Sequence, residues 1–109
     1  MLAKARRLPV GDFFGRRGQV VRLPYAIFRI FPAEAGYPRF GVVVPKKSFA
    51  TAVLRNRLKR AFFGAAREVY SRVAPRDVLL TLLPPASDFQ SSELREKLVL
   101  DFIRYLSQT

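Results

Sequence analysis

The residues best suited to chemistry in this sequence are cationic side chains between positions 46 and 60. This stretch holds no acidic residue and six basic ones, namely Lys46, Lys47, Arg55, Arg57, Lys59 and Arg60. Exposed helix faces usually mix charges, so that side chains four residues apart attract each other. Arginine donates forked hydrogen bonds to phosphate oxygens, and Asn56 can donate and accept toward a base edge or a sugar hydroxyl. The cluster indicates a surface for an anionic partner, with an ordinary solvated helix face as the alternative.

The net charge of the chain is concentrated in its first two thirds. Residues 1–72 hold 16 Lys or Arg against three acidic residues, whereas residues 73–109 hold four against five. A field of this size opposes compaction through self-repulsion, and a polyanion offsets it. We therefore expect nucleic acid as the partner first, and an anionic membrane second.

Several classes of enzyme site are excluded by residues that the chain lacks. It contains no histidine and no cysteine, so a His-based catalytic triad, a His- or thiolate-ligated metal and a disulfide are impossible. Its aspartates are scattered and show no paired spacing for metal ions, so a self-contained nuclease is the least favoured reading. We expect no catalytic residue and no metal ligand in this chain.

Length and hydropathy favour one small domain spanning residues 1–109. Half of the residues are hydrophobic, which argues against disorder. No apolar run approaches the roughly 18 to 20 residues of a membrane span, and the N-terminal residues lack the apolar core of a secretion signal. We expect a cytoplasmic protein, monomeric alone, without membrane attachment.

The first third of the chain predicts a helix followed by extended chain. Residues 9–17 read as a short helix with Pro9 in its first turn and Gly18 just past its end. Residues 19–31 read as a strand bent at Pro24. Alternation there places an apolar set toward the core (Ala26, Phe28, Ile30) and a second set on the other face (Tyr25, Ile27, Arg29, Phe31).

The remaining pattern predicts strand, helix, strand and helix. Residues 39–45 are a valine-rich strand, a helix runs from about Ser48 or Thr51 to Val73, and 77–85 are a short apolar strand. Residues 91–109 are a final helix that Ser91 or Ser92 can cap. The fold expected from this order is α+β, with helices packed on a sheet in a two-layer sandwich.

The helix after Thr51 carries two distinct faces. With Arg55 set at 0° and 100° per residue, its apolar side chains lie between about 240° and 340°. The polar side chains, including Asn56 and Arg67, lie between 0° and about 200°. Lys46 and Lys47 precede this helix, where they extend the cationic face or, alternatively, protect a strand end. One face therefore serves the core and the other is cationic.

The segment "RFGVVVPKKSFATAVLRNRLKR" (39–60) closely resembles the signature of the bacterial ribonuclease P protein family. It has a glycine-containing strand, a lysine pair, a spacer, an Ala-Val step and an R-N-R-x-K-R helix in order. Weaker similarity appears in "RLPVGDF" (7–13) and in residues 77–83. Where the family usually continues with an Arg-Glu pair, this chain has Phe63 and Gly64, and an Arg-Glu pair follows one turn later at Arg67 and Glu68.

The resemblance implies a function. In this family a catalytic RNA with bound Mg²⁺ removes the 5′ leader from precursor tRNA, so the protein is the RNA-binding subunit of an endoribonuclease, expected at one protein per RNA. The residues implied to face the catalytic RNA are Lys46, Lys47, Arg55, Asn56, Arg57, Lys59, Arg60 and Arg67. Those implied for the leader-binding cleft are Phe13, Tyr25, Ile27, Arg29 and Phe31, where aromatic stacking would tolerate variable bases.

The resemblance also implies a central mixed sheet of about four strands, three helices, and a left-handed crossover around the basic helix. Generic topology rules would give the opposite hand. Phe63 is expected on the cationic face, where it stacks on RNA or, as we favour, packs under another element. Gly64 inside a helix costs roughly 1 kcal/mol relative to alanine.

Two other functions remain open at this point. A general binder of structured RNA, such as a ribosome-associated protein, would use the same helix without a catalytic partner. A membrane-surface protein would lay the basic amphipathic helix on anionic lipid, which requires its apolar stripe to be exposed.

Overall fold

The computed structural model describes Arg7 and residues 17–107. Within this part the chain forms four strands and two α-helices, and the helix predicted over residues 9–17 lies outside it except for Arg17. The elements are β1 (Gln19–Leu23), β2 (Ala26–Pro32), β3 (Arg39–Val43), α1 (Ala52–Val69), β4 (Arg76–Leu82) and α2 (Ser91–Leu106). Two short 3₁₀ helices, η3 (Tyr70–Arg72) and η4 (Pro84–Asp88), precede β4 and α2.

The four strands form one mixed sheet in the order β1-β2-β4-β3. β2 pairs antiparallel with both β1 and β4, and β3 pairs parallel with β4. The prediction of one bent strand over residues 19–31 was wrong, because the chain reverses at Pro24 and Tyr25 and pairs Leu23 with Ala26. The α+β class and the mixed sheet are confirmed.

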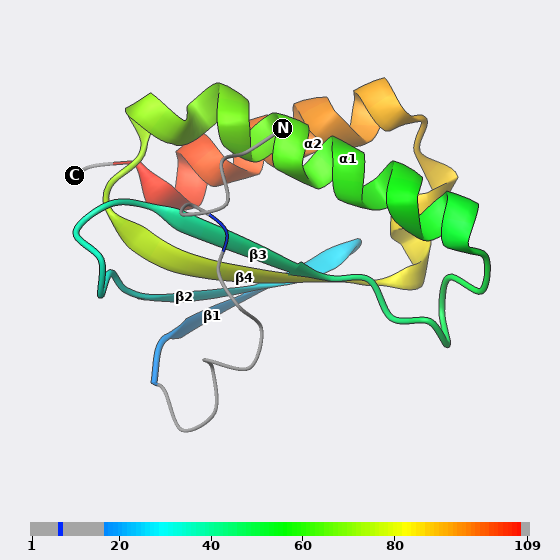
Figure 1. Cartoon of the computed structure of the whole chain (residues 1–109), viewed down its shortest axis with the longest axis horizontal. Coiled ribbons are helices and arrows are strands. Elements are labelled where there is room, and N and C mark those ends of the chain that lie inside the picture. The colour runs from blue at the N-terminus through cyan, green and yellow to red at the C-terminus, as the bar shows by residue number, and fades with distance from the viewer. Residues whose placement is uncertain (1–6, 8–16, 108–109) are drawn as a thin grey trace.

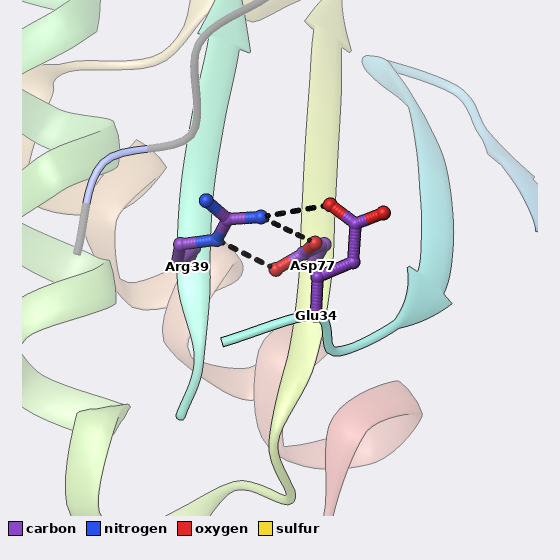
Figure 2. Close-up of polar contacts among 3 residues, drawn as sticks. All are labelled: Glu34, Arg39 and Asp77. Carbon is purple, nitrogen blue, oxygen red and sulfur yellow. Dashed lines mark hydrogen bonds and ion pairs between the residues drawn. The ribbon is translucent and has the colours of Figure 1, made fainter. Parts of the chain in front are cut away.

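The connection from β3 through α1 to β4 has the predicted left hand. Both helices cover the same face of the sheet (Figure 1). Seen from the other face, β3 and β4 both run upward and β4 lies to the right of β3 (Figure 2). With α1 behind the sheet, that step to the right is a left-handed crossover, the rare hand for this unit.

The hydrophobic core lies between this sheet and the two helices. The sheet contributes alternate residues, among them Phe28, Phe40 and Leu80, which are fully buried. Of the predicted stripe, α1 buries all members but one and leaves Leu54 half-buried, and it also buries Ala66. The buried members are Leu58, Ala61, Phe62, Ala65 and Val69. Because this stripe is buried, it is not available to lie on a membrane. Neither helix is long and apolar enough to cross a bilayer, as far as the described residues go.

Both helices begin at side-chain caps. Thr51 accepts a hydrogen bond from the backbone N–H of Leu54 at 3.2 Å, as expected for an N-cap. α2 is capped by Gln90 rather than by Ser91 or Ser92, because Gln90 and Glu93 form a reciprocal capping box. The two serines are thereby left in the first turn of α2, exposed to solvent.

A buried ion pair joins β3 to β4 on the face of the sheet that carries no helix. Arg39 donates to both carboxylate oxygens of Asp77, at 3.0 and 2.8 Å, and its Nη2 also lies 3.4 Å from Glu34 (Figure 2). Asp77 is completely buried, and hydrogen bonding to it raises the pKa of Arg39. A bidentate pair of this kind fixes the register of two strands that are far apart in sequence.

We predict that Asp77→Ala lowers the free energy of unfolding by about 3–5 kcal/mol, because it leaves the Arg39 guanidinium without its buried partner. Glu34→Ala is the matched control, since the Glu34 side chain is 64% exposed and its removal should cost less than about 1 kcal/mol. Urea denaturation followed by circular dichroism measures both values. Equal losses in the two variants would contradict the assignment.

Candidate nucleic-acid interface

The solvent side of α1 presents the predicted cationic face. Asn56, Lys59, Arg60 and Arg67 are exposed, and none makes a hydrogen bond or ion pair with another described residue. They occupy an arc of about 100° on the helix. Val53 lies at the edge of this arc and is 81% exposed. These side chains are therefore free to contact an anionic partner.

Two of the predicted residues are partly used within the protein. Arg55 donates through Nη1 to the backbone carbonyls of Phe49 and Ala50, at 2.8 and 2.9 Å. Arg57 reaches the carbonyl of Phe89, just before α2, at 3.3 Å. Both side chains are half-buried. Arg55 thus holds the loop before α1, and Arg57 holds the segment before α2. Their remaining N–H donors can bind a partner.

Lys46 and Lys47 lie in the loop that joins β3 to α1. Both are exposed, whereas the nearby Phe49 is fully buried and anchors the loop. The loop is also held by the hydrogen bond from Arg55 to the Phe49 carbonyl. The structure thus brings the lysine pair to the N-terminal end of α1, as the sequence predicts.

Phe63 and Gly64 each accommodate an arginine from another part of the chain. Phe63 is half-buried, packs edge-on against Phe62, and carries the guanidinium of Arg7 over its ring at 5.2 Å. Of the two alternatives for Phe63, the structure confirms the one that we favour, since its ring packs within the protein. A side chain at position 64 would touch Arg95 of α2, whose Nε lies 3.5 Å from an ideal Cβ there. Sequence patterns within α1 gave no signal for Arg7 or Arg95.

We predict that Gly64→Ala raises the free energy of unfolding by up to about 1 kcal/mol, because the new methyl group would make only ordinary contacts and the unfolded chain would lose freedom. Gly18→Ala should do the reverse, since a Cβ at position 18 would lie 2.3 Å from the Ile30 carbonyl oxygen. Thermal unfolding of the two variants tests this pair. Destabilisation by Gly64→Ala would show that Arg95 cannot adjust.

The second predicted site, the leader-binding cleft, is only partly assembled on the helix-free face of the sheet. Ile27, Arg29 and Phe31 alternate on that face of β2, and Phe31 is buried there. Arg29 is half-buried and lies 3.5 Å from the Thr81 hydroxyl. Phe13 lies outside the described residues. Their contact with a nucleic acid stays a prediction.

Tyr25 was assigned to the wrong face. It sits in the turn between β1 and β2, is buried in the core, and donates its hydroxyl to Asp101 of α2 at 2.5 Å. Its ring meets Phe89 edge-on, with centroids 6.0 Å apart. Burial and the bond to Asp101 both raise the pKa of its hydroxyl. Tyr25 ties the β1–β2 turn to α2 and is not part of the helix-free face.

We predict that Tyr25→Phe lowers the free energy of unfolding by about 1.5–3 kcal/mol, because it removes the hydrogen bond that the Tyr25 hydroxyl donates to the charged carboxylate of Asp101. The raised pKa means that this contribution is complete below the unfolded-state pKa of about 10 and is lost above it. The difference between wild type and variant should therefore shrink as the pH rises beyond 10. Tyr37→Phe, at an exposed position, should change stability by less than about 0.5 kcal/mol.

Acidic residues do not assemble into a metal site in the part of the chain that the structure describes. No group of three or more potential metal-ligating side chains occurs there. Asp77 is engaged by Arg39, and Asp101 by Tyr25. The exposed cations and hydrogen-bond donors of α1 are the complement of a phosphate backbone.

The fold and this surface define a class: a small, basic α+β protein with a left-handed β3-α1-β4 unit, whose connecting helix displays the positive charge. Comparison with known proteins then identifies the family. The Ribonuclease P family profile matches residues 11–105, so the chain belongs to the ribonuclease P protein family.

Relatives by sequence are named "Ribonuclease P protein component". The one from Nitrosococcus oceani is 32% identical over 72 residues, covering 66% of this chain and 60% of that protein. The one from Lactobacillus delbrueckii subsp. bulgaricus is 44% identical over 62 residues, covering 56% of this chain and 51% of that protein. The chain thus spans between half and two thirds of the length of these relatives.

Solved structures match over more of the chain. The Staphylococcus aureus RNase P protein superposes with a TM-score of 0.82 at 25% identity, covering 96% of this chain and all of that one. The RNase P protein from Thermotoga maritima gives 0.78 at 24% identity, covering 94% of this chain and 98% of that one, and supports the fold alone.

Proposed function

We propose that this protein is the RNA-binding subunit of ribonuclease P, which assists a catalytic RNA in removing the 5′ leader from precursor tRNA. The observation that carries the proposal is the exposed cationic arc of α1, without internal partners, in a chain of this family. Asn56, Lys59 and Arg60 contact the RNA backbone directly. Arg55 and Arg57 fix the segments that flank this surface through hydrogen bonds to backbone carbonyls, and they contact RNA with their remaining N–H donors.

The leader of the precursor tRNA binds the helix-free face of the sheet. Ile27 and Arg29 offer an apolar surface and a cation there, while Phe31 is largely covered. This arrangement suits a single strand of variable sequence, because backbone charge and apolar contact need no base-specific hydrogen bonds. The two RNA surfaces then lie on opposite sides of the sheet, so one protein can contact catalyst and substrate together.

Mg²⁺ enters this proposal through the RNA. As the resemblance to the family implies, the ion is bound mainly by phosphate and base oxygens of the partner RNA, which are ligands that Mg²⁺ prefers. The protein contributes positive charge, which lowers the concentration of Mg²⁺ needed to neutralise the RNA. We propose that catalysis resides in the RNA.

A reconstitution assay tests the proposal. We expect the protein to increase leader removal from a precursor tRNA by a bacterial ribonuclease P RNA at low Mg²⁺, with the effect shrinking as Mg²⁺ is raised. Absence of any effect at low Mg²⁺ would overturn the proposal. Equal affinity for unrelated structured RNAs, together with no effect on cleavage, would favour a general RNA-binding protein instead.

We predict that the double variant Lys59→Ala/Arg60→Ala weakens binding to that RNA about tenfold or more and reduces the slope of log K against log salt by about two. These positions leave the fold intact, because neither side chain makes a described internal bond. Filter binding across a potassium chloride series measures both quantities. The control Arg72→Ala/Arg104→Ala removes the same charge near the C-terminal ends of α1 and α2, and should stay within about twofold of wild type.

A further inference from the structure

A charged groove between α1 and α2 is not explained by the cationic arc alone. The two helices run side by side in the same direction (Figure 1), so the start of α2 lies beside the middle of α1. The groove has a volume of about 550 Å³. It is lined by Arg57, Arg60, Ala61 and Glu68 from α1 and by Ser91, Ser92, Arg95 and Glu96 from α2. Three arginines from two helices thus converge on one depression.

Arg95 is oriented into this groove by contacts on α1. Its side chain lies against Gly64, with Nε 3.5 Å from the position that a Cβ would take there. Its Nη2 lies 3.7 Å from Glu68, and both side chains are about half exposed. A pair at this distance and exposure aligns the guanidinium but neutralises little of its charge. Arg95 therefore keeps donors for a ligand in the groove.

The groove is continuous with the cationic arc through Arg60, which belongs to both. Next to it, Ser91 and Ser92 add exposed hydroxyl donors beside Arg57. Glu68 and Glu96 also line the groove and would disfavour phosphate close to their carboxylates. An RNA backbone crossing the arc would therefore enter where Arg57 and Arg60 of α1 face Ser92 of α2, and would meet Arg95 on the same wall as Ser92.

We propose that this groove binds the sugar–phosphate backbone of the RNA partner, so that Arg95 and Ser92 extend the RNA footprint from α1 onto α2. The inference rests on the proposed function for the identity of the RNA, but its chemistry requires only structured RNA. Arginine forks on both walls, together with the serine hydroxyls on the α2 wall, suit phosphate oxygens and ribose hydroxyls.

Arg95→Ala tests the proposal in the full chain, with a transcript of a bacterial ribonuclease P RNA as the probe. We expect three- to tenfold weaker binding and a salt slope reduced by about one, while Arg95→Lys retains most of the affinity. Arg104→Ala is the matched control, because Arg104 is exposed on the same helix but lies about 180° away from Arg95. Circular dichroism confirms that each variant is folded. Equal affinities for the Arg95→Ala and Arg104→Ala variants would overturn the inference.

Site-directed crosslinking provides a second readout, because the chain has no native cysteine. A photocrosslinker attached to the Ser92→Cys variant should label the RNA. The Leu100→Cys variant should not, since Leu100 is 67% exposed but lies about 140° around α2 from Arg95. The Val53→Cys variant marks the cationic arc and is the positive control.

The outcomes separate this inference from the proposed function. Crosslinks from position 53 but not from position 92 would overturn the groove and leave the proposed function standing. A second outcome would support the groove and overturn the proposed function. In it, Arg95→Ala weakens binding to all structured RNAs equally, and the wild-type protein does not stimulate cleavage. Crosslinks from position 92 to a copy of the protein, and not to RNA, would show that the groove is a protein contact and overturn the inference.

Discussion

The contact of Phe102 with three other phenylalanines holds the two layers of this protein together. The ring of Phe102 lies 5.5 Å from Phe28 on β2, 5.3 Å from Phe40 on β3 and 5.7 Å from Phe62 on α1, measured between centroids. One side chain of α2 therefore contacts both the sheet and the neighbouring helix. Because Phe62 must face this cluster, the rotation of α1 about its axis is fixed, and its cationic arc must face solvent.

The charge on that arc opposes folding, and the rest of the molecule has to offset it. α1 has no acidic residue in its first turn, where a carboxylate would be favoured by the helix dipole. Its exposed cations repel one another and find no acidic partner among the described residues, because Glu68 of α1 pairs with Arg95 of α2 instead. The well-formed ion pair is placed elsewhere, between Arg39 and Asp77, where it joins two strands. Because its buried face packs in the core, α1 stays folded although its exposed charges are not neutralised. A surface that binds an anionic partner requires such unneutralised charges.

Features set by short-range periodicity could be predicted from the sequence. The spacing of Leu58, Ala61, Ala65 and Val69 predicts α1 and its two faces, and the structure confirms both. The hairpin at Pro24 was missed because neither Pro24 nor Tyr25 has a positive φ, so the glycine or asparagine signal of a tight hairpin is absent. Tyr25 was consequently placed by alternation along a strand that ends before it. The resemblance to a family, rather than any physical rule, predicted the left-handed crossover.

Contacts between distant segments could not be predicted, and they complete the candidate surface. Phe63 and Gly64 remove side-chain charge from α1 at the two positions where the family pattern has an Arg-Glu pair. In the folded chain, the ring of Phe63 supports Arg7, and the bare backbone of Gly64 makes room for Arg95. Positive charge is thus supplied at these positions by residues 56 and 31 positions away from them in sequence. An Arg-Glu pair carries no net charge, so this region of the folded chain is more positive than the family pattern alone predicts. A phosphate backbone responds to where such charges lie in space and not to which element carries them.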